Sequence, residues 1–178
     1  MRCAVEVASV RAEPREDAEQ VTQALRGEPL QVEERRDGWA HVVTAYDYPG
    51  WIREAELCGD SPLELARTFL GAPYEWGGLS AHGIDCSGLV HLAYRLCGTL
   101  VPRDAWQQDE AGTEVEEPQP GDLVTYGEPV DHVAFWAGEG RILHATGREG
   151  VRAVVMEPEP AELLLRRRRV VRIAVSPL

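Results

Sequence analysis

Short runs in which hydrophobic and polar residues alternate fill the first third of the chain. Alternation with a period of two is typical of strands, and glycines between the runs favour tight turns. The runs are residues 5–7, 30–33, 39–43 and 49–52. Several short strands joined by glycine turns predict a small all-β barrel over residues 1–58.

The pattern changes to helical spacing at residue 61. Residues 61–64 (SPLE) predict the start of a helix, because serine caps, proline suits the first helical position and glutamate completes a capping box. Apolar residues then recur three and four positions apart up to Gly71, and again from Cys86 to Gly98. A third, short helix is predicted near Asp104.

From residue 122 onward the alternating pattern returns. The predicted strands are residues 123–126, 133–136, 141–144, 151–155 and 170–175. Helices followed by strands predict an α+β domain with an antiparallel sheet, which we place at residues 61–178. The arginine run at residues 166–169 is typical of a solvated helix end or of an edge strand protected by charge.

Cys86 opens the second predicted helix of this domain, directly after a polar, glycine-bearing loop. The unpaired N–H groups of a helix N-terminus carry partial positive charge, which favours a thiolate, the nucleophilic form of cysteine. Backbone N–H groups around Cys86 can also stabilise a developing oxyanion. The alternative is a cysteine that only packs in the core. Cys86 is therefore the candidate nucleophile.

Two of the five histidines flank a predicted hairpin: His132 begins one strand and His144 ends the next. In a tight hairpin centred near Gly138 these two positions lie directly opposite each other on one face, with Cβ atoms about 5 Å apart. One imidazole can then act as a general base while the other holds it in the required tautomer. The alternative is a cross-strand pair of structural histidines.

Composition narrows the function classes. The net charge is −12, so we expect no binding to nucleic acid. We find no apolar run of signal-peptide or membrane-spanning length, and we therefore expect a cytoplasmic protein without membrane contact. The four cysteines lack metal-ligand spacing, so no zinc site is expected. Nucleophilic catalysis by Cys86 with a histidine base needs neither a metal nor an organic cofactor, and we expect none.

Several segments of the second domain resemble the NlpC-type cell-wall cysteine peptidases. They are residues 71–78 (GAPYEWGG), 83–90 (GIDCSGLV), 102–104 (PRD), 120–123 (PGDL), 131–134 (DHVA) and 142–145 (ILHA). The resemblance implies a papain-like fold with a central antiparallel sheet. It also implies that Cys86 is the nucleophile, His132 the base and His144 the residue that orients the base. Members of this family hydrolyse peptide bonds in murein, commonly the bond from γ-D-glutamate to a diamino acid.

The first domain resembles the bacterial SH3-like family in the order of its short motifs. These are residues 10–14 (VRAEP), 27–30 (GEPL), 38–42 (GWAHV) and 50–52 (GWI). One such module before the peptidase domain is similar to the γ-D-glutamyl-L-diamino acid endopeptidases, which process murein peptides with a free N-terminal L-alanine. That similarity implies that the barrel helps to close the substrate cleft and that Tyr48 contacts the end of the substrate.

The same resemblance implies substrate-binding roles for four residues near the nucleophile: Asp85, Ser87, Arg103 and Asp104. An arginine can bind the α-carboxylate of D-glutamate bidentately. An aspartate can hold the ammonium group of L-alanine, but the sequence leaves open which acidic residue does so.

Two further positions bear on the predicted site. The phenol of Tyr74, in the loop before the nucleophile, either donates to the oxyanion or only packs. Ala105 follows Arg103 and Asp104 where this group often has serine, and a lost hydroxyl contact costs about 0.5–1.5 kcal/mol. We expect such a loss to shift substrate preference without abolishing catalysis.

Together these patterns predict a cytoplasmic cysteine peptidase of murein recycling that acts on small L-Ala-γ-D-Glu-diamino acid peptides. One alternative is an amidase or acyltransferase with the same Cys-His-His set. Another is a non-catalytic wall-binding protein, against which the filled positions Cys86, His132 and His144 argue. The sequence leaves open the preferred diamino acid, the need for a free L-alanine, the oligomeric state and whether an N-terminal segment was removed.

Overall fold

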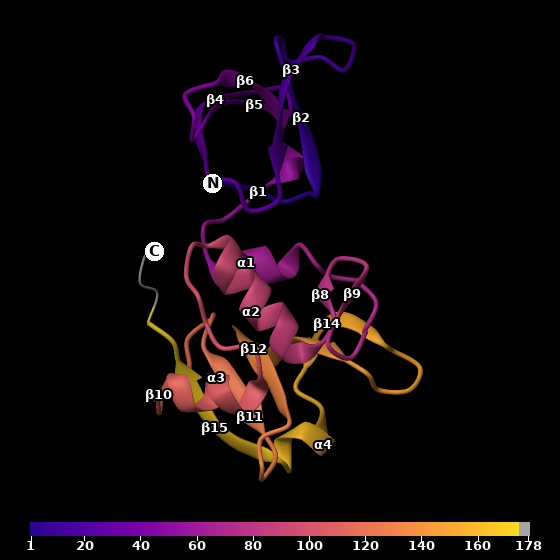
Figure 1. The fold of residues 1–178 in the computed structure, drawn as a ribbon, viewed down its shortest axis with the longest axis vertical. Coiled ribbons are helices and arrows are strands. Elements are labelled where there is room, and N and C mark those ends of the chain that lie inside the picture. Colours follow the sequence, from indigo (N-terminus) through magenta and orange to yellow (C-terminus); the bar gives the residue numbers. More distant parts are fainter. Residues whose placement is uncertain (175–178) are drawn as a thin grey trace. The chain divides into compact units, whose positions relative to one another are not determined.

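The computed structural model describes residues 1–174, which fold as two compact units (Figure 1). The first unit comprises Met1–Asp60, and the second begins at Ser61. Each unit has its own sheet and its own hydrophobic core. The predicted barrel and the predicted α+β domain therefore correspond to separate bodies of the structure.

The first unit is built on a five-stranded antiparallel sheet in the order β3-β2-β6-β5-β4. Its strands are β2 (Val7–Arg11), β3 (Gln20–Leu25), β4 (Leu30–Arg36), β5 (Trp39–Thr44) and β6 (Pro49–Arg53). A 3-10 turn, η1 (Glu54–Glu56), leads to β7 (Leu57–Cys58), which pairs with β1 (Arg2–Cys3). The core consists of small and branched residues such as Val10, Val42 and Ile52. Strand β3 was not predicted from the sequence.

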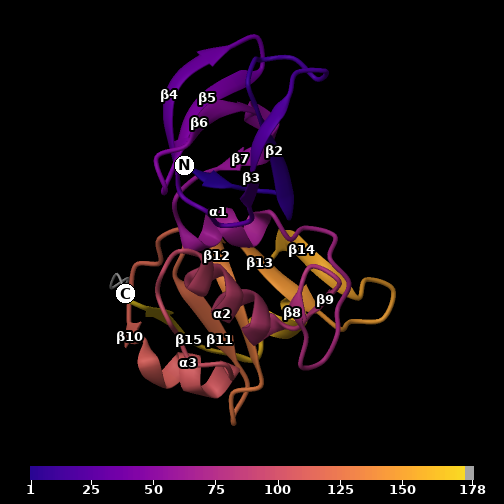
Figure 2. The ribbon, with the colours of Figure 1, turned by 45° about the horizontal axis from the view of Figure 1, so that its top comes forward.

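The second unit contains a six-stranded antiparallel sheet in the order β10-β15-β11-β12-β13-β14 (Figure 2). Its strands are β10 (Thr113–Glu114), β11 (Leu123–Tyr126), β12 (His132–Gly138), β13 (Arg141–Thr146), β14 (Ala153–Pro158) and β15 (Arg167–Arg172). A small separate hairpin is formed by β8 (Leu79–Ser80) and β9 (Gly83–Ile84). These findings confirm the predicted α+β class with an antiparallel sheet.

Four helices accompany this sheet: α1 (Pro62–Arg67), α2 (Cys86–Leu96), α3 (Ala105–Ala111) and α4 (Ala161–Leu164). As predicted, Ser61 caps α1 and accepts a hydrogen bond from the Glu64 backbone N–H at 3.2 Å. Helix α3 begins after its N-cap, Asp104, which also agrees with the sequence. None of the helices formed by residues 1–174 is long and apolar enough to cross a membrane.

The two faces of the sheet have different partners. Helix α2 packs on β12 and β13, and the ring of Tyr94 stacks on Phe135 with 6.1 Å between the ring centroids. On the opposite face of the sheet, side chains such as Ala134 and Ile142 pack with Leu163 of α4 in a second cluster. Because side chains alternate along a strand, His132 and His144 belong to this second face.

The β12–β13 hairpin differs from the predicted geometry. Phe135 pairs with Leu143, Gly138 pairs with Arg141, and the register shifts between Trp136 and Gly138. With this register His132 and His144 are diagonal neighbours on one face, not directly opposite residues. The physical reason is a two-residue turn at Glu139 and Gly140, both with positive φ, preceded by the irregularity between Trp136 and Gly138.

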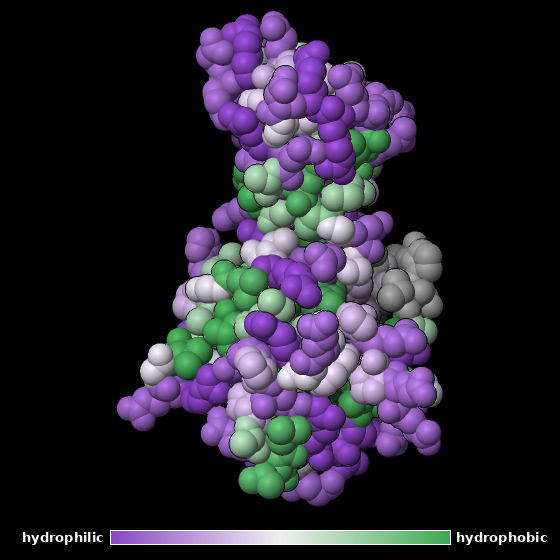
Figure 3. Space-filling model, turned by 180° about the vertical axis from the view of Figure 1, so that it is seen from behind, coloured by the Kyte–Doolittle hydropathy of each residue, from purple (hydrophilic) through white to green (hydrophobic). Residues whose placement is uncertain are grey.

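The arginines of β15, and Arg166 directly before this strand, form ion pairs with acidic residues. Arg166 pairs with Asp131, Arg167 with Glu159, Arg169 with Asp109, and Arg172 with Asp122. The run is thus a row of ion pairs rather than a free basic surface. Figure 3 shows that hydrophilic residues cover much of one face of the second unit, with hydrophobic residues in smaller patches.

Candidate active site

Cys86 occupies the first position of helix α2, as the sequence predicted. Asp85 is the N-cap, and its Oδ1 accepts a hydrogen bond from the Gly88 N–H at 2.7 Å. Its Oδ2 accepts from the Gly77 N–H, also at 2.7 Å, which ties the preceding loop to the helix start. A Cβ atom on Gly88 would lie 2.4 Å from the Gly78 carbonyl oxygen, so this close approach requires glycine.

The thiol of Cys86 is buried, with 6% of the residue exposed. Burial raises the pKa of this thiol to about 11, although the Val133 backbone N–H donates to the sulfur and acts in the opposite direction. The negative charge of Asp85 contributes to this rise in pKa. The expectation that the helix N-terminus favours a thiolate is therefore corrected. At neutral pH the group is a thiol and needs a base to become nucleophilic.

The two predicted histidines meet directly. His132 Nε2 lies 2.8 Å from His144 Nδ1, and the two rings are edge to face. The pKa of His132 is lowered to about 3, chiefly by burial and also by the neighbouring His144 and Arg166. Burial also lowers the pKa of His144. Both rings are therefore neutral near pH 7, which is the state that a general base requires.

Cys86 and His132 belong to the same small region of the unit. The backbone group that donates to the Cys86 sulfur is the N–H of Val133, the residue that follows His132 in β12. The structure thus brings the N-terminal end of α2 close to the first residues of β12, the strand that carries the candidate base.

Sequence reasoning missed the residue beyond His144. His144 Nε2 lies 3.0 Å from Oε1 of Glu157, and Oε2 of Glu157 accepts from Arg148 Nη2 at 2.9 Å. Glu157 was missed because the predicted strand ended at residue 155, whereas β14 continues to Pro158. Alternation from Val155, which pairs with His144, places Glu157 on the same face and would have been the usable signal.

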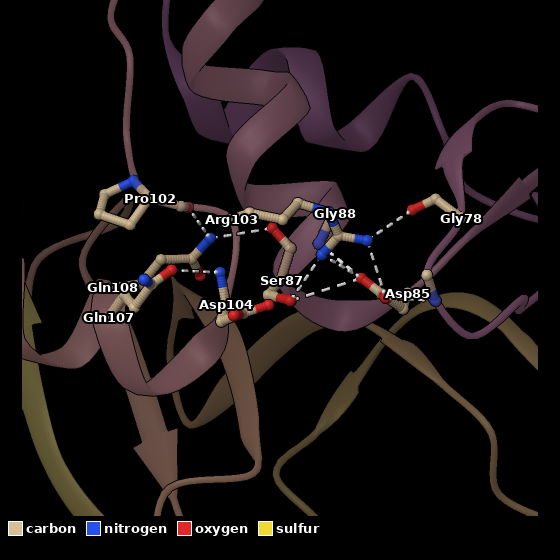
Figure 4. Close-up of polar contacts among 10 residues, drawn as sticks. Gly78, Asp85, Ser87, Gly88, Pro102, Arg103, Asp104, Gln107 and Gln108 are labelled. Atoms are coloured by element: carbon tan, nitrogen blue, oxygen red, sulfur yellow. Dashed lines mark hydrogen bonds and ion pairs between the residues drawn. The ribbon is translucent and has the colours of Figure 1, made fainter.

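Arg103 and Asp85 bind each other bidentately (Figure 4). Arg103 Nη1 donates to Oδ1 and Nη2 donates to Oδ2, each at 2.9 Å. The remaining hydrogens on these nitrogens go to Ser87 Oγ at 2.9 Å and to the Gly78 carbonyl oxygen at 3.1 Å. The sequence predicted a bidentate bond from Arg103 to a substrate carboxylate. In this structure those donors are engaged with Asp85, Ser87 and Gly78, and binding of a substrate carboxylate by Arg103 stays a prediction.

A buried glutamine connects α3 to the nucleophile helix (Figure 4). Gln108 is fully buried, and its Nε2 donates to the Ser87 carbonyl at 2.9 Å and to the Pro102 carbonyl at 2.8 Å. This role of Gln108 was not predicted from the sequence. Because Gln108 lies on α3, it fixes the segment that bears Arg103 and Asp104 against the first turn of α2.

A cavity of about 500 Å³ opens beside Cys86. It is lined by Trp76, Asp85, Cys86, Ser87, Arg103, Asp104, Ala105, Trp106 and Asp131, among others. Four of the predicted substrate-binding residues and the alanine that departs from the common pattern thus surround one space next to the thiol. The cavity is large enough for a short peptide.

A second cavity, of about 410 Å³, lies beside the histidines. His132, His144 and Arg148 line it, together with Tyr74. Trp76 and Asp131 border both cavities, so the two spaces adjoin. The indole of Trp76 is exposed at this boundary, with 82% of the residue accessible.

Tyr74 lies close enough to Cys86 for their charges to interact. Burial raises the pKa of the Tyr74 phenol, and Cys86 and Asp85 raise it further. A phenol that stays protonated is a hydrogen-bond donor. Its predicted role as a donor to the oxyanion stays a prediction.

Tyr48 belongs to the first unit, in the turn between β5 and β6, and 43% of the residue is exposed. Its backbone N–H donates to Thr44 Oγ1 at 3.0 Å. Its contact with a substrate stays a prediction.

Within residues 1–174, no group of three or more His, Cys, Asp or Glu side chains is arranged to hold a metal ion.

Comparison with protein families gives two matches. Residues 71–168 match the NlpC/P60 family, and residues 10–57 match the bacterial dipeptidyl-peptidase Sh3 domain. A protein of Bacillus cereus named γ-D-glutamyl-L-lysine dipeptidyl-peptidase is 36% identical over 97 residues, which is 51% of this chain and 29% of that protein. This chain therefore spans less than a third of the length of that relative.

Solved structures support the same grouping. A crystal structure of an NlpC/P60 family protein from Bacillus cereus covers 96% of this chain and 62% of its own, with 25% identity and a TM-score of 0.63. RipD of Mycobacterium tuberculosis, described as a non-catalytic NlpC/p60 domain protein adapted to peptidoglycan binding, covers 65% of this chain and 96% of its own, with 25% identity and a TM-score of 0.56. The family match spans more than half of the chain, and it includes the buried cysteine and both histidines. The chain belongs to the NlpC/P60 family and carries a bacterial SH3 domain before its NlpC/P60 domain.

Proposed function

We propose that this chain is a cysteine peptidase that hydrolyses the γ-D-glutamyl–L-diamino acid bond of murein peptides with a free N-terminal L-alanine. One observation carries the proposal. The buried thiol of Cys86 accepts a hydrogen bond from the residue after His132, and His132 is bonded to His144. The name of the Bacillus cereus relative supports this choice of bond.

The proposed reaction proceeds through a thioester. The Cys86 sulfur attacks the carbonyl carbon of the γ-glutamyl amide while its proton passes to His132. The backbone N–H of Cys86 and the Tyr74 hydroxyl donate to the resulting oxyanion. When the C–N bond breaks, His132 returns the proton to the leaving amine. A water molecule, deprotonated by His132, then cleaves the thioester and restores the thiol.

The pKa values favour proton transfer that is coupled to the attack. The pKa of Cys86 is raised to about 11 and that of His132 is lowered to about 3, so the thiol and the imidazole are both uncharged before substrate binds. A separated thiolate–imidazolium pair is unfavourable in this buried site. The carbonyl carbon must therefore be in place when the proton moves.

The two adjoining cavities suggest how the substrate binds. We place the L-Ala-γ-D-Glu part in the cavity beside Cys86 and the leaving diamino acid in the cavity beside the histidines. The scissile amide then lies at their shared border, where both the sulfur and the base can reach it. This orientation is consistent with transfer of the acyl group to Cys86 and of a proton to the departing amine.

Asp104 is the acidic residue that we propose for the L-alanine ammonium. Three acids line the first cavity, and two of them have arginine partners: Asp85 binds Arg103, and Asp131 binds Arg166. Among residues 1–174, no arginine or histidine forms an ion pair with Asp104. Its negative charge is therefore available for a cation of the substrate.

We also propose that the substrates are small, soluble murein peptides and that the enzyme serves murein recycling in the cytoplasm. The net charge of −12 supports this, because it opposes contact with a polyanionic wall polymer. Cell fractionation with an antibody against the chain tests the location. Release of peptides from purified sacculi at the rate seen with soluble peptides would contradict the proposed substrate class.

Mass spectrometry of products tests the proposed bond and terminus. The substrates are L-Ala-γ-D-Glu-diaminopimelate, the same peptide with lysine as the diamino acid, and N-acetylated copies of both. The proposal expects release of L-Ala-D-Glu from the free peptides only. Equal cleavage of the acetylated copies would contradict the terminus requirement. Absence of cleavage of all four peptides, with activity on another amide or acyl donor, would favour the amidase or acyltransferase alternative.

A further inference from the structure

A line of three side chains crosses three neighbouring strands of the second unit. His132 of β12 bonds to His144 of β13, and His144 bonds to Glu157 of β14, at 2.8 Å and 3.0 Å. Each step is diagonal across an antiparallel pair, as the registers of both hairpins show. The line therefore runs from the candidate base to a carboxylate two strands away.

The carboxylate determines which nitrogens along this line carry hydrogen. An ionised carboxylate only accepts, so Nε2 of His144 must be the protonated nitrogen of that neutral ring. Nδ1 of His144 then has a free lone pair and accepts from Nε2–H of His132. The neutral His132 ring is left with an unprotonated Nδ1, which is the nitrogen that can take a proton from the thiol.

Arg148 keeps Glu157 in the accepting state. Arg148 Nη2 donates to Oε2 of Glu157 at 2.9 Å, while Oε1 faces His144. Burial alone would raise the pKa of Glu157, but the hydrogen bonds from Arg148 and His144 outweigh it and hold the pKa below its usual range. Because an arginine has no acceptor, Arg148 also forces any group at position 157 to present an oxygen toward it.

We propose that Glu157, held by Arg148, is the positioning residue that sets the tautomers of His144 and His132 and so leaves His132 Nδ1 free to act as the base. The role as a base rests on the proposed function, whereas the tautomer assignment does not. Similar carboxylates behind imidazoles fix tautomers in other catalytic sites, and replacing one by its amide can cost about 10⁴ in turnover.

The variant Glu157→Gln gives a specific expectation. Its amide oxygen must face Arg148, so its NH₂ group points at His144 Nε2. That nitrogen must then accept, the hydrogen moves to His144 Nδ1, and His132 is driven to carry hydrogen on Nδ1. Both rings change tautomer although the side chain keeps its size. In the double variant Arg148→Met/Glu157→Gln the amide can rotate and offer its oxygen to His144 again.

Long-range ¹H–¹⁵N spectra of the histidine side chains test this directly, with peaks assigned through His132→Gln and His144→Gln. In the wild type we expect Nε2–H tautomers for both rings, a change to Nδ1–H in Glu157→Gln, and at least partial return in the double variant. Glu162→Gln is the matched control. Oε1 of Glu162 lies 3.6 Å from Nη1 of Arg148, whereas Nε2 of His144 is bonded to Glu157. Its tautomers should match those of the wild type.

The outcomes separate this proposal from the proposed function. Wild-type tautomers retained in Glu157→Gln, or a double variant identical to the single one, would overturn the role of the Glu157–Arg148 pair whatever the enzyme hydrolyses. Where peptide cleavage is observed, we expect kcat to fall at least about a hundredfold in Glu157→Gln with KM little changed, and to recover about tenfold in the double variant. A switch of tautomers without loss of turnover would overturn the link to catalysis.

Discussion

His132 and His144 are diagonal neighbours across the β12–β13 hairpin, and only 2.8 Å separates Nε2 of one from Nδ1 of the other. Diagonal positions on one face of a sheet are farther apart than directly opposite ones, but imidazoles are long enough to bridge them. The irregularity at Trp136 and Gly138 sets this offset. The pair therefore depends on the register of the hairpin as well as on the two residues.

Removing the partner of His132 should reduce turnover more than binding. In His144→Phe an aromatic ring is kept, but His132 Nε2–H loses its acceptor, so the base is no longer held in one orientation and tautomer. We expect kcat to fall about 10- to 100-fold with KM within about a factor of two. Steady-state kinetics on the free tripeptide measures this.

His41→Phe is the matched control for that variant, because His41 belongs to β5 of the first unit and pairs with Glu33. Its kcat should equal that of the wild type. A fall in kcat in His41→Phe as large as in His144→Phe would contradict a specific role for the His132–His144 bond.

The lowered pKa of His132 should make folding sensitive to acid. The pKa of His132 is lowered from its usual 6.5 to about 3 in the folded state, so the unfolded chain binds its proton first as pH falls. Above pH 6.5 the neutral His132 ring makes its full contribution to the free energy of unfolding. Between pH 6.5 and pH 3 this free energy falls by up to about 1.4 kcal/mol per pH unit. Urea unfolding between pH 7 and pH 4 should show a shallower pH dependence for His132→Gln. Parallel curves for the two proteins would argue against a buried neutral ring.

Asp104 should matter only for substrates with a free amine. A hydrogen bond between charged groups contributes about 1.5–3 kcal/mol, so Asp104→Asn should lower kcat/KM for the free peptide about 10- to 150-fold. Any slow cleavage of the N-acetylated peptide should be unaffected. Glu110→Gln, on the same helix but outside both cavities, is the control and should match the wild type. An equal loss on free and acetylated peptides in Asp104→Asn would count against ammonium binding.

The Arg103–Asp85 pair should be visible in stability. Arg103→Met leaves the carboxylate of Asp85, of which 8% is exposed, without its cation, and we expect a loss of about 3 kcal/mol in the free energy of unfolding. The double variant Asp85→Asn/Arg103→Met should recover part of it, because no buried charge remains. Arg15→Met removes a half-exposed pair with Asp17 and should cost less than about 1 kcal/mol. Equal effects of Arg103→Met and Arg15→Met would show that the buried pair is not structural.

The sequence predicted the parts of this site that depend on local pattern. The capped helix start at Cys86 and the two histidines on neighbouring strands follow from spacing alone, and the family resemblance is confirmed by the match to residues 71–168. Long-range pairing was not predictable. Arg103 was assigned only a substrate-binding role, because no local pattern shows that Asp85 is its partner. The thiol was read as acidic because helix position is visible in a sequence and burial is not.

Other differences come from strand limits and register. Strand β3 (Gln20–Leu25) contains mainly polar residues, so alternation gave too weak a signal there. Strand β14 extends three residues past its predicted end, which hid Glu157. The turn at Glu139 and Gly140 shifted the histidine pair from opposite to diagonal. Such details depend on how two strands settle against each other, which a single strand's sequence does not contain.

The claim that Cys86 is the nucleophile of a murein peptidase is tested most directly by trapping its thioester. Wild-type protein is mixed with L-Ala-γ-D-Glu-diaminopimelate, quenched in acid within milliseconds, digested and mapped by mass spectrometry. The account expects an L-Ala-γ-D-Glu acyl group on the peptide that contains Cys86, absent in Cys86→Ala together with all cleavage. Undiminished cleavage by Cys86→Ala, or an acyl group on another residue, would contradict it.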